Sequence, residues 1–172
     1  PQRLAVRTLG SGRLLSSAPL GPAMRTRFGA PYLVIHRADL HTVLLDAARS
    51  RPGIRLLVGR AAVAAETHGD HALVKIETGT GQSETMAAPL IVGADGVWSK
   101  MRAATGDTRA PHYRGYAAWR TTIPVEAVPA GIDPRETGLW LGGGLHLVHY
   151  AVSGNRSVNI VAVVSAPSKV DG

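Results

Sequence analysis

The pattern of apolar and polar positions predicts one amphipathic helix in the first third of the chain. Four apolar residues recur there at the spacing of one helical face: Leu40, Val43, Leu44 and Ala47. Asp39 comes just before this face, where a carboxylate can cap the amino end of a helix. The segment 50–53 contains proline and glycine and therefore predicts the end of the helix.

Short apolar or alternating segments predict strands on either side of a β-ribbon. Residues 54–58, apolar except for Arg55, and the apolar run 89–94 are typical of buried strands. Residues 61–66 and 72–77 predict the two arms of the ribbon, with its turn at Gly69-Asp70. The run 89–94 ends in a glycine-containing loop, as expected where a central strand delivers a loop to a ligand.

The chain becomes richer in strands after residue 108, where the segments 113–123, 138–141, 145–152 and 157–165 are predicted. The fold class is therefore α/β in the wider α+β sense, with a domain boundary near residues 107–111. We expect three parts. They are β segments at 1–32 that pack with the last part, a partial Rossmann-like domain at 33–108, and a mixed or antiparallel β-sheet domain at 109–172.

Composition changes this picture little. The 172 residues carry a formal net charge of +7, but the basic residues are dispersed and only 5% of residues are aromatic, which disfavours nucleic acid as a partner. Two readings stay open: a basic surface that attracts anionic ligands, and an ordinary solvated surface. Cysteine is absent, which excludes disulfides and thiolate chemistry. Without an apolar leader or spanning segment, a cytoplasmic location with no membrane partner is expected.

The segment 93–102, Gly-Ala-Asp-Gly-Val-Trp-Ser-Lys-Met-Arg, carries the strongest chemical signal. Gly93 and Gly96 allow backbone to approach a phosphate or ribose closely. Asp95 offers a carboxylate to sugar hydroxyls or to an arginine, and Ser99 opens a short helix whose amino end favours negative charge. Arg102 can pair with Asp95 or with a phosphate. The alternative is a strand-loop-helix corner in which Asp95 is a structural cap.

This segment resembles the G-A-D-G-x-x-S-x-x-R signature of the class A flavoprotein monooxygenases, the family of salicylate and hydroxybenzoate hydroxylases. In that family the motif lies beside the FAD pyrophosphate and affects the use of NAD(P)H. The resemblance therefore implies cofactor contacts for these residues: Gly93, Asp95, Gly96, Ser99 and Arg102.

Two further segments resemble the same family. Arg37, in Ile-His-Arg-Ala-Asp-Leu, matches an arginine that contacts FAD, and the backbone near Ala62 and Val63 would then lie against the adenine. The segment 113–120 resembles the strand that begins the substrate domain. Its Trp119 and Arg120 are interpreted as a core aromatic and a sheet-edge cation, with substrate contact as the alternative.

His146 and Tyr150 are the candidate catalytic residues. On a strand they share one face, whereas His149 points to the other. The resemblance implies that a histidine and a tyrosine at this spacing face the flavin, and that the histidine helps to deprotonate a phenol; an imidazole is suited to such a base near neutral pH. No metal site is predicted, because the histidines do not converge and no carboxylate cluster accompanies them.

The resemblance implies an enzyme that uses FAD, NAD(P)H and O2 to hydroxylate a small phenolic or aromatic acid through a flavin hydroperoxide. No G-x-G-x-x-G follows a strand near residue 1, and the family's late Gly-Asp motif is expected after residue 172. We therefore expect a central fragment that is inactive and binds FAD weakly or not at all by itself. The alternatives are a related oxidoreductase acting on a polyketide, quinone precursor or alkene, and a noncatalytic basic binding module. The oligomeric state stays open, a dimer being one option.

Overall fold

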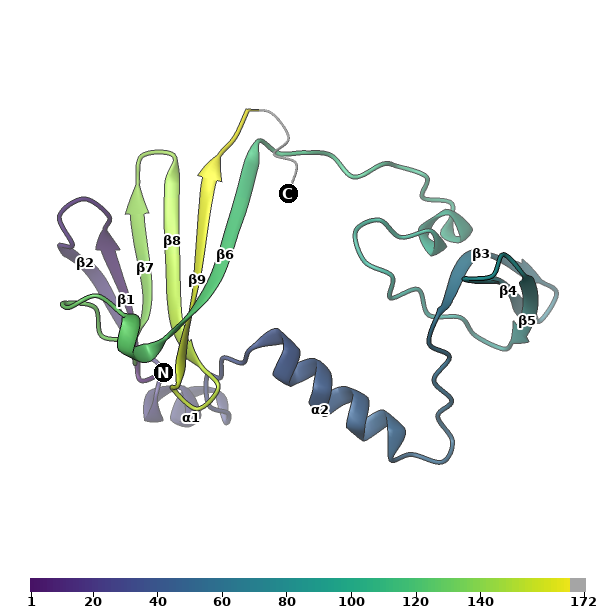
Figure 1. The fold of residues 1–172 in the computed structure, drawn as a ribbon, viewed down its shortest axis with the longest axis horizontal. Helices are drawn as coiled ribbons and strands as arrows, with labels where there is room; N and C mark the ends of the chain where they lie inside the picture. Colours follow the sequence, from purple (N-terminus) through teal and green to yellow (C-terminus); the bar gives the residue numbers. More distant parts are fainter. Residues whose placement is uncertain (168–172) are drawn as a thin grey trace. The chain divides into compact units, whose positions relative to one another are not determined.

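The chain forms two compact units, which are described separately. The structure is a computed structural model and describes residues 1–167. One unit combines residues 1–50 with the chain from Tyr113 onward, and the other comprises residues 51–112. Figure 1 shows the elements of both units in sequence colours. The last five residues of the predicted domain 109–172 lie outside the described residues.

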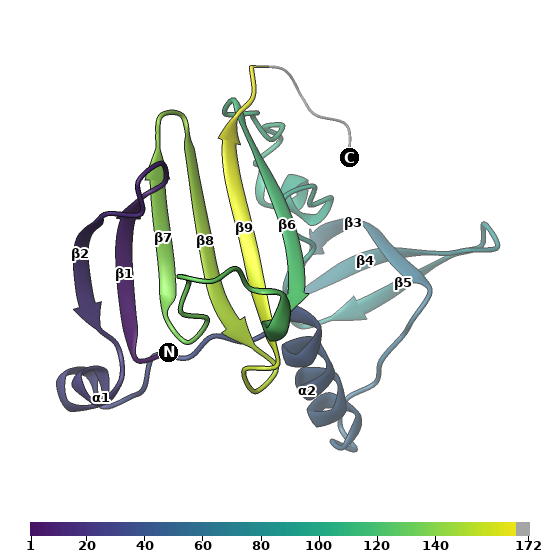
Figure 2. The same cartoon turned by 60° about the vertical axis from the view of Figure 1, so that its left-hand side comes forward.

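The first unit is built on a six-stranded sheet with the order β2-β1-β7-β8-β9-β6 (Figures 1 and 2). Its strands are β1 (Arg3–Thr8), β2 (Leu14–Pro19), β6 (Tyr116–Pro124), β7 (Thr137–Gly142), β8 (Leu145–Val152) and β9 (Ser157–Ser165). Neighbouring strands are antiparallel except β1 and β7, which are parallel. The same unit contains the helices α1 (Pro22–Phe28), α2 (Arg37–Arg49) and the short 3-10 helix η2 (Val125–Ala127).

Glycine-containing turns set the register of the last three strands, as the sequence predicts. Gly144 has a φ of +70° in the turn between β7 and β8. The turn from β8 to β9 contains three consecutive residues with positive φ, Ser153, Gly154 and Asn155. Residues other than glycine rarely adopt a positive φ, although asparagine does so more often than most. The resulting register places Tyr150 opposite Asn159.

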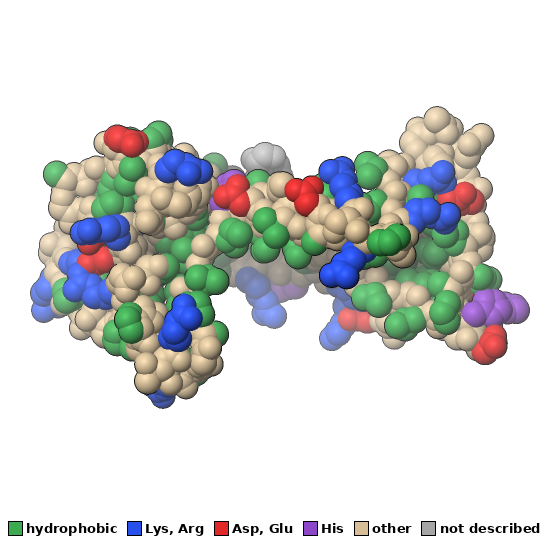
Figure 3. Space-filling model, turned by 90° about the horizontal axis from the view of Figure 1, so that it is seen from below, with side chains coloured by type: hydrophobic (Ala, Val, Ile, Leu, Met, Phe, Trp, Pro, Cys, Tyr) green, Lys and Arg blue, Asp and Glu red, His purple; other side chains and the backbone are tan. Residues whose placement is uncertain are grey.

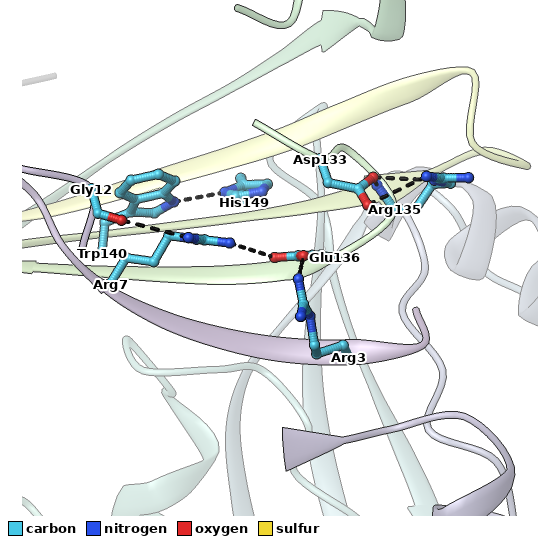
Figure 4. Close-up of polar contacts among 8 residues, drawn as sticks. All are labelled: Arg3, Arg7, Gly12, Asp133, Arg135, Glu136, Trp140 and His149. Carbon is cyan, nitrogen blue, oxygen red and sulfur yellow. Dashed lines mark hydrogen bonds and ion pairs between the residues drawn. The ribbon is translucent and has the colours of Figure 1, made fainter. Parts of the chain in front are cut away.

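A buried carboxylate fastens β1 to the segment that leads into β7 (Figure 4). Glu136 is 7% exposed and accepts hydrogen bonds from the guanidinium groups of Arg3 and Arg7 on β1. Burying a carboxylate is costly unless it is paired, and here two arginines pair with it. The parallel β1–β7 pairing therefore has an ionic link at the end where β7 begins.

A second contact on this sheet involves His149 on β8. Its side chain is 4% exposed, and Trp140 Nε1 on β7 donates a hydrogen bond of 2.9 Å to its Nδ1. A methyl group added at Gly138 would lie 2.0 Å from the imidazole ring, so only glycine leaves room for it. Burial lowers the pKa of His149, and the nearby Arg7 acts in the same direction. Asp133 opposes this shift, and burial outweighs it, so the surroundings of His149 favour the uncharged imidazole in the packed sheet.

The second unit contains the three-stranded antiparallel sheet β3 (Arg60–His68), β4 (His71–Thr78) and β5 (Ser83–Ala88), followed by the 3-10 helix η1 (Met101–Thr105). The predicted ribbon and its turn at Gly69-Asp70 are confirmed. The pairing register shifts between Ala62 and Ala64, so Val63 is the bulged residue of β3. Strand β5, after the turn at Gly79 and Gly81, was not anticipated.

Two predicted strands are wrong. Residues 54–58 and 89–94 have no strand structure. Their apolar side chains remain in solvent, with Val58 88%, Leu90 74% and Val92 77% exposed. An apolar run becomes a strand only where another strand accepts its backbone hydrogen bonds, and the described residues supply no such partner. The apolar character of these runs was identified from the sequence, but their partners were not.

The predicted helix is confirmed as α2, with a different beginning. His36, rather than Asp39, occupies the N-cap position, and Asp39 lies in the first turn. Asp39 accepts a hydrogen bond of 3.1 Å from Ser153 in the β8–β9 turn, so its carboxylate links the helix to the sheet instead of capping it. Helix α1, in the stretch expected to be β-like, has Pro22 in its first turn and Gly29 at its carboxyl end.

The chain divides at other places than the predicted domains do. The contacts group α2 with the sheet, whereas the prediction placed residues 33–108 together. Compactness does not define a functional domain, so the predicted domain assignment stays a prediction.

No helix within residues 1–167 is both long enough and apolar enough to cross a membrane. Figure 3 shows lysine and arginine side chains dispersed over the visible face, in agreement with their spacing in the sequence.

Removing the Glu136 carboxylate is expected to destabilise the sheet. Glu136→Ala leaves Arg3 and Arg7 without their shared acceptor, which should lower the free energy of unfolding by about 1–3 kcal/mol. The measurement is urea unfolding followed by circular dichroism. Arg135→Ala is the control, because this 79% exposed side chain pairs with Asp133 on the same loop and should contribute about 0–1 kcal/mol. Equal losses in the two variants would contradict the role of Glu136.

Candidate functional site

The loop 93–102, here the Asp95 loop, is organised by its own aspartate. Ser99 Oγ donates a hydrogen bond of 2.6 Å to Asp95 Oδ1. The backbone N–H groups of Lys100 and Met101 donate to Asp95 Oδ2 at 2.7 and 3.1 Å. Ser99 Oγ in turn accepts a 3.0 Å bond from the N–H of Arg102. Asp95 and Ser99 together satisfy the first N–H groups of η1, as capping residues do.

The hydrogen bonds change the acidity of Asp95. They favour the charged carboxylate and lower its pKa from an ordinary 3.8 to about 2, the bond from Ser99 having the largest effect and the N–H of Met101 the next. Asp95 is therefore an anion at any physiological pH. Within residues 1–167, the side-chain contacts of Asp95 are those of a structural cap.

The shape of the Asp95 loop also depends on Arg102 and on the two glycines, Gly93 and Gly96. Arg102 donates to the carbonyl oxygens of Val97 at 2.7 Å and Arg109 at 3.3 Å, and the predicted pairing with Asp95 is not formed. A Cβ at Gly93 would lie 2.9 Å from Met101 Cβ, so glycine here permits close packing of the loop on η1. Gly96 has a φ of +80°, which favours glycine, and its α-carbon faces open space.

A hollow of about 620 Å³ lies between the Asp95 loop and the β3–β4 ribbon. Its lining includes all five cofactor-binding candidates of the loop: Gly93, Asp95, Gly96, Ser99 and Arg102. The structure thus brings these five together at the edge of one concave surface. Ala62 and Val63, on β3, do not line it.

Arg37 lies in the other unit, at the first position of α2, and lines a separate hollow of about 470 Å³. We call it the Arg37 hollow. Its polar lining comes from the start of α2 and from the strands β6, β8 and β9: His36, Arg37, Arg120, Thr121, Thr122, Tyr150 and Asn159. Figures 1 and 2 both show the start of α2 near the lower ends of β6 and β9.

The two catalytic candidates are placed differently. Tyr150 is half-buried on β8 and lines the Arg37 hollow. His146 is also half-buried, opposite Leu141 on β7 and Val163 on β9, but does not line this hollow. The alternation of β8 directs both side chains to one face of the sheet, and His149 to the opposite face. The predicted shared face is therefore present.

Sequence reasoning did not select Arg120 or Asn159 as functional residues. Arg120 lies on β6, an edge strand of the sheet, as its sheet-edge interpretation requires, but its side chain also lines the Arg37 hollow. Trp119 is 58% exposed, so its interpretation as a core aromatic is wrong for residues 1–167. The signal for Arg120 is the register: Arg120 pairs with Val161 on β9, two residues beyond Asn159.

The acidity of Asp95 can be tested directly. Because its pKa is lowered on folding, the ordered loop gains stability above pH 3.8, and this stability is lost as the pH falls through about 2. An NMR titration of the side-chain carboxyl carbon should give a midpoint near 2. Ser99→Ala removes the largest cause and should move the midpoint toward 3.8, whereas Thr105→Ala, in the same segment, should leave it in place. A midpoint near 4 in the unaltered protein would contradict the hydrogen-bond arrangement.

Comparisons with known proteins agree with this organisation. The family model described as "FAD binding domain" matches residues 22–143. The chain is 36% identical over 170 residues to a 3-amino-4-hydroxybenzoate 2-monooxygenase of Streptomyces cremeus, covering 98% of this chain and 41% of the relative. It is 31% identical to 3-hydroxybenzoate 6-hydroxylase 1 of Aquipseudomonas alcaligenes, covering 86% of this chain and 36% of the relative.

Solved structures share the fold. HpxO of Klebsiella pneumoniae, as its R204Q variant complexed with FAD, superposes with a TM-score of 0.78 at 22% identity and covers 99% of this chain and 42% of that one. A salicylate hydroxylase substrate complex gives a TM-score of 0.69 at 24% identity, with 98% and 41% covered. These matches bear out the mixed, strand-rich α/β fold. The chain spans about two fifths of the length of these relatives. It belongs to the FAD-binding family of class A aromatic monooxygenases.

Proposed function

We propose that the complete protein hydroxylates a small phenolic or other aromatic acid, with FAD, NAD(P)H and O2 as cofactor and co-substrates. The observation that carries the proposal is the Arg37 hollow, where a cofactor-contact candidate and a catalytic candidate, Arg37 and Tyr150, line one concavity. A volume of about 470 Å³ is within the range of small-molecule sites. The names of the relatives, which act on hydroxybenzoates, support an aromatic acid as substrate.

The residues present suit FAD. The side chain of Arg37 is exposed and makes no hydrogen bond or ion pair with the side chains or backbone of residues 1–167, which leaves its guanidinium available to a phosphate. Gly96 presents backbone toward open space, so a cofactor can approach without meeting a side chain. When bound, FAD supplies the redox chemistry with NAD(P)H and O2, and the protein contributes binding, orientation and protonation.

In this proposal Asp95 acts by ordering its loop. Its carboxylate already accepts three hydrogen bonds from Ser99, Lys100 and Met101, so it fixes the backbone that a dinucleotide would meet. Ser99 and Arg102 serve the same purpose through their own loop contacts. The backbone at Ala62 and Val63 is proposed to lie against the adenine, and the bulge at Val63 breaks the regular pairing there.

The proton chemistry is assigned to the face of β8 that His146 and Tyr150 share. A base that removes the phenolic proton makes the aromatic ring more nucleophilic, and an imidazole suits this task near neutral pH. His146 is proposed as this base. Tyr150, beside Arg37, is proposed to orient the substrate by a hydrogen bond from its hydroxyl. His149 is left out, because its Nδ1 already accepts the Trp140 hydrogen bond.

The function is tested with a panel of hydroxybenzoates and hydroxynicotinates, by following both NAD(P)H oxidation and hydroxylated product in the complete protein. His146→Ala should lower kcat for product formation about 10²- to 10⁴-fold, the usual contribution of a general base. The loss should be smaller at high pH, where the substrate ionises by itself.

His68→Ala is the matched control, since this exposed histidine is at the tip of the β3–β4 ribbon, lines neither hollow and should leave turnover unchanged. Full hydroxylation with normal NAD(P)H consumption in the His146→Ala variant would remove the proposed role of His146. If no aromatic acid in the panel is hydroxylated, whereas a polyketide, quinone precursor or alkene is, the proposed substrate class is wrong.

A further inference from the structure

Two arginines line the Arg37 hollow, and the proposed function assigns a role to only one of them. Two arginines from distant parts of the chain, Arg37 on α2 and Arg120 on β6, line it together with His36. No aspartate or glutamate is among its lining residues. Asp39, the nearest acid along α2, does not line the hollow; its carboxylate accepts a hydrogen bond from Ser153 and lies 3.9 Å from Nδ1 of His36.

Neither arginine is neutralised within the described chain. Among residues 1–167, Arg37 and Arg120 take part in no ion pair, whereas other arginines of the same unit do: Arg3, Arg7 and Arg135. Both arginines line one concavity, so an anion bound there would interact favourably with each of them. The charge arrangement therefore favours a ligand with a negatively charged oxygen.

The other lining residues can complete the coordination of such a ligand. The side-chain amide of Asn159 can donate, and so can the hydroxyls of Thr122 and Tyr150. Tyr150 and Asn159 are cross-strand neighbours, and Thr122 pairs with Asn159 on the other side, so the three donors lie in one row across β8, β9 and β6. Arg120 is two residues before Thr122 on the same face of β6.

We propose that Arg120, together with Arg37 and Asn159, forms an oxyanion-binding site in which Arg120 is a specificity-determining residue. The inference deepens the proposed function and rests on it for the choice of ligand. The anion is a phosphate of the cofactor or the carboxylate of the aromatic acid, and both offer the paired oxygens that an arginine fork recognises.

The test measures binding rather than turnover, in the complete protein. In the first arm, FAD is titrated into the apoprotein and its fluorescence quenching gives Kd. In the second arm, benzoate and its uncharged analogue benzamide are titrated into the FAD-loaded protein, and the flavin absorbance change gives each Kd. The phosphate source predicts an effect in the first arm, and the carboxylate source an effect on benzoate in the second.

Arg120→Gln is expected to weaken one charged ligand about 10- to 100-fold, the contribution of one charge-assisted contact, without changing benzamide binding. Arg120→Lys, which keeps the charge but not the fork, should recover part of this loss. The matched control is Arg114→Gln, an exposed arginine just before β6 that does not line the hollow.

A second variant tests the same site independently, in case Arg120→Gln does not fold. Asn159→Asp places a negative charge in the hollow and should weaken the same ligand by a similar factor. Circular dichroism and thermal melting verify that each variant is folded. The proposal is overturned if Arg120→Gln, folded, stays within twofold of the unaltered protein in both arms, or if it weakens benzamide as much as benzoate. Loss of FAD affinity in Arg120→Gln, in a protein that hydroxylates no aromatic acid, would reject the proposed function and retain the oxyanion site.

Discussion

The parallel pairing of β1 with β7 is the constraint on which the first unit depends. It joins the amino-terminal residues to a strand more than a hundred positions later in the chain. Every other strand pairing in the sheet is antiparallel, and none of them connects β1 or β2 to the later strands. Closing so large a loop costs conformational entropy, which the buried Glu136 and its two arginines help to offset. The polypeptide between β1 and β7 also contains α2, whose first turn reaches the sheet through the bond between Asp39 and Ser153. Arg37 lies near Tyr150 because both connections exist.

Charge is arranged in opposite ways at two places on this sheet, near the start of β7 and at the Arg37 hollow. Near the start of β7, one buried carboxylate serves two arginines, and the ion pairs are internal to the protein. At the Arg37 hollow, two arginines lie beside hydroxyl and amide groups without an acid. A protein gains nothing in stability from the second arrangement, since unpaired like charges repel. In the proposed oxyanion site this arrangement serves binding and not folding.

The local patterns in the sequence were sufficient for those elements whose partners are close in the chain. The ribbon around Gly69-Asp70, the hairpins of β7, β8 and β9, and the helix α2 follow from alternation, turn glycines and helical spacing. The segments 54–58 and 89–94 failed because a buried strand is specified by a remote partner, which local composition does not identify. The Arg37 hollow was not predicted from the sequence for the same reason. Residues 37 and 120 become neighbours only through the β6–β9 register and the position of α2.

The Asp95 loop shows that the fixed residues of a sequence motif also have structural roles within their own loop. The fixed aspartate, serine and arginine were interpreted as groups that reach outward to a ligand. In the structure Asp95 and Ser99 bond the first N–H groups of η1, and Arg102 bonds two loop carbonyls. Each fixed side chain thus satisfies backbone that would otherwise be unpaired. What the loop can offer a dinucleotide is its ordered backbone, above all at Gly96, where no side chain intervenes. The same spacing of residues is then required whether or not any of the three side chains touches the cofactor, because the shape of the loop depends on all of them.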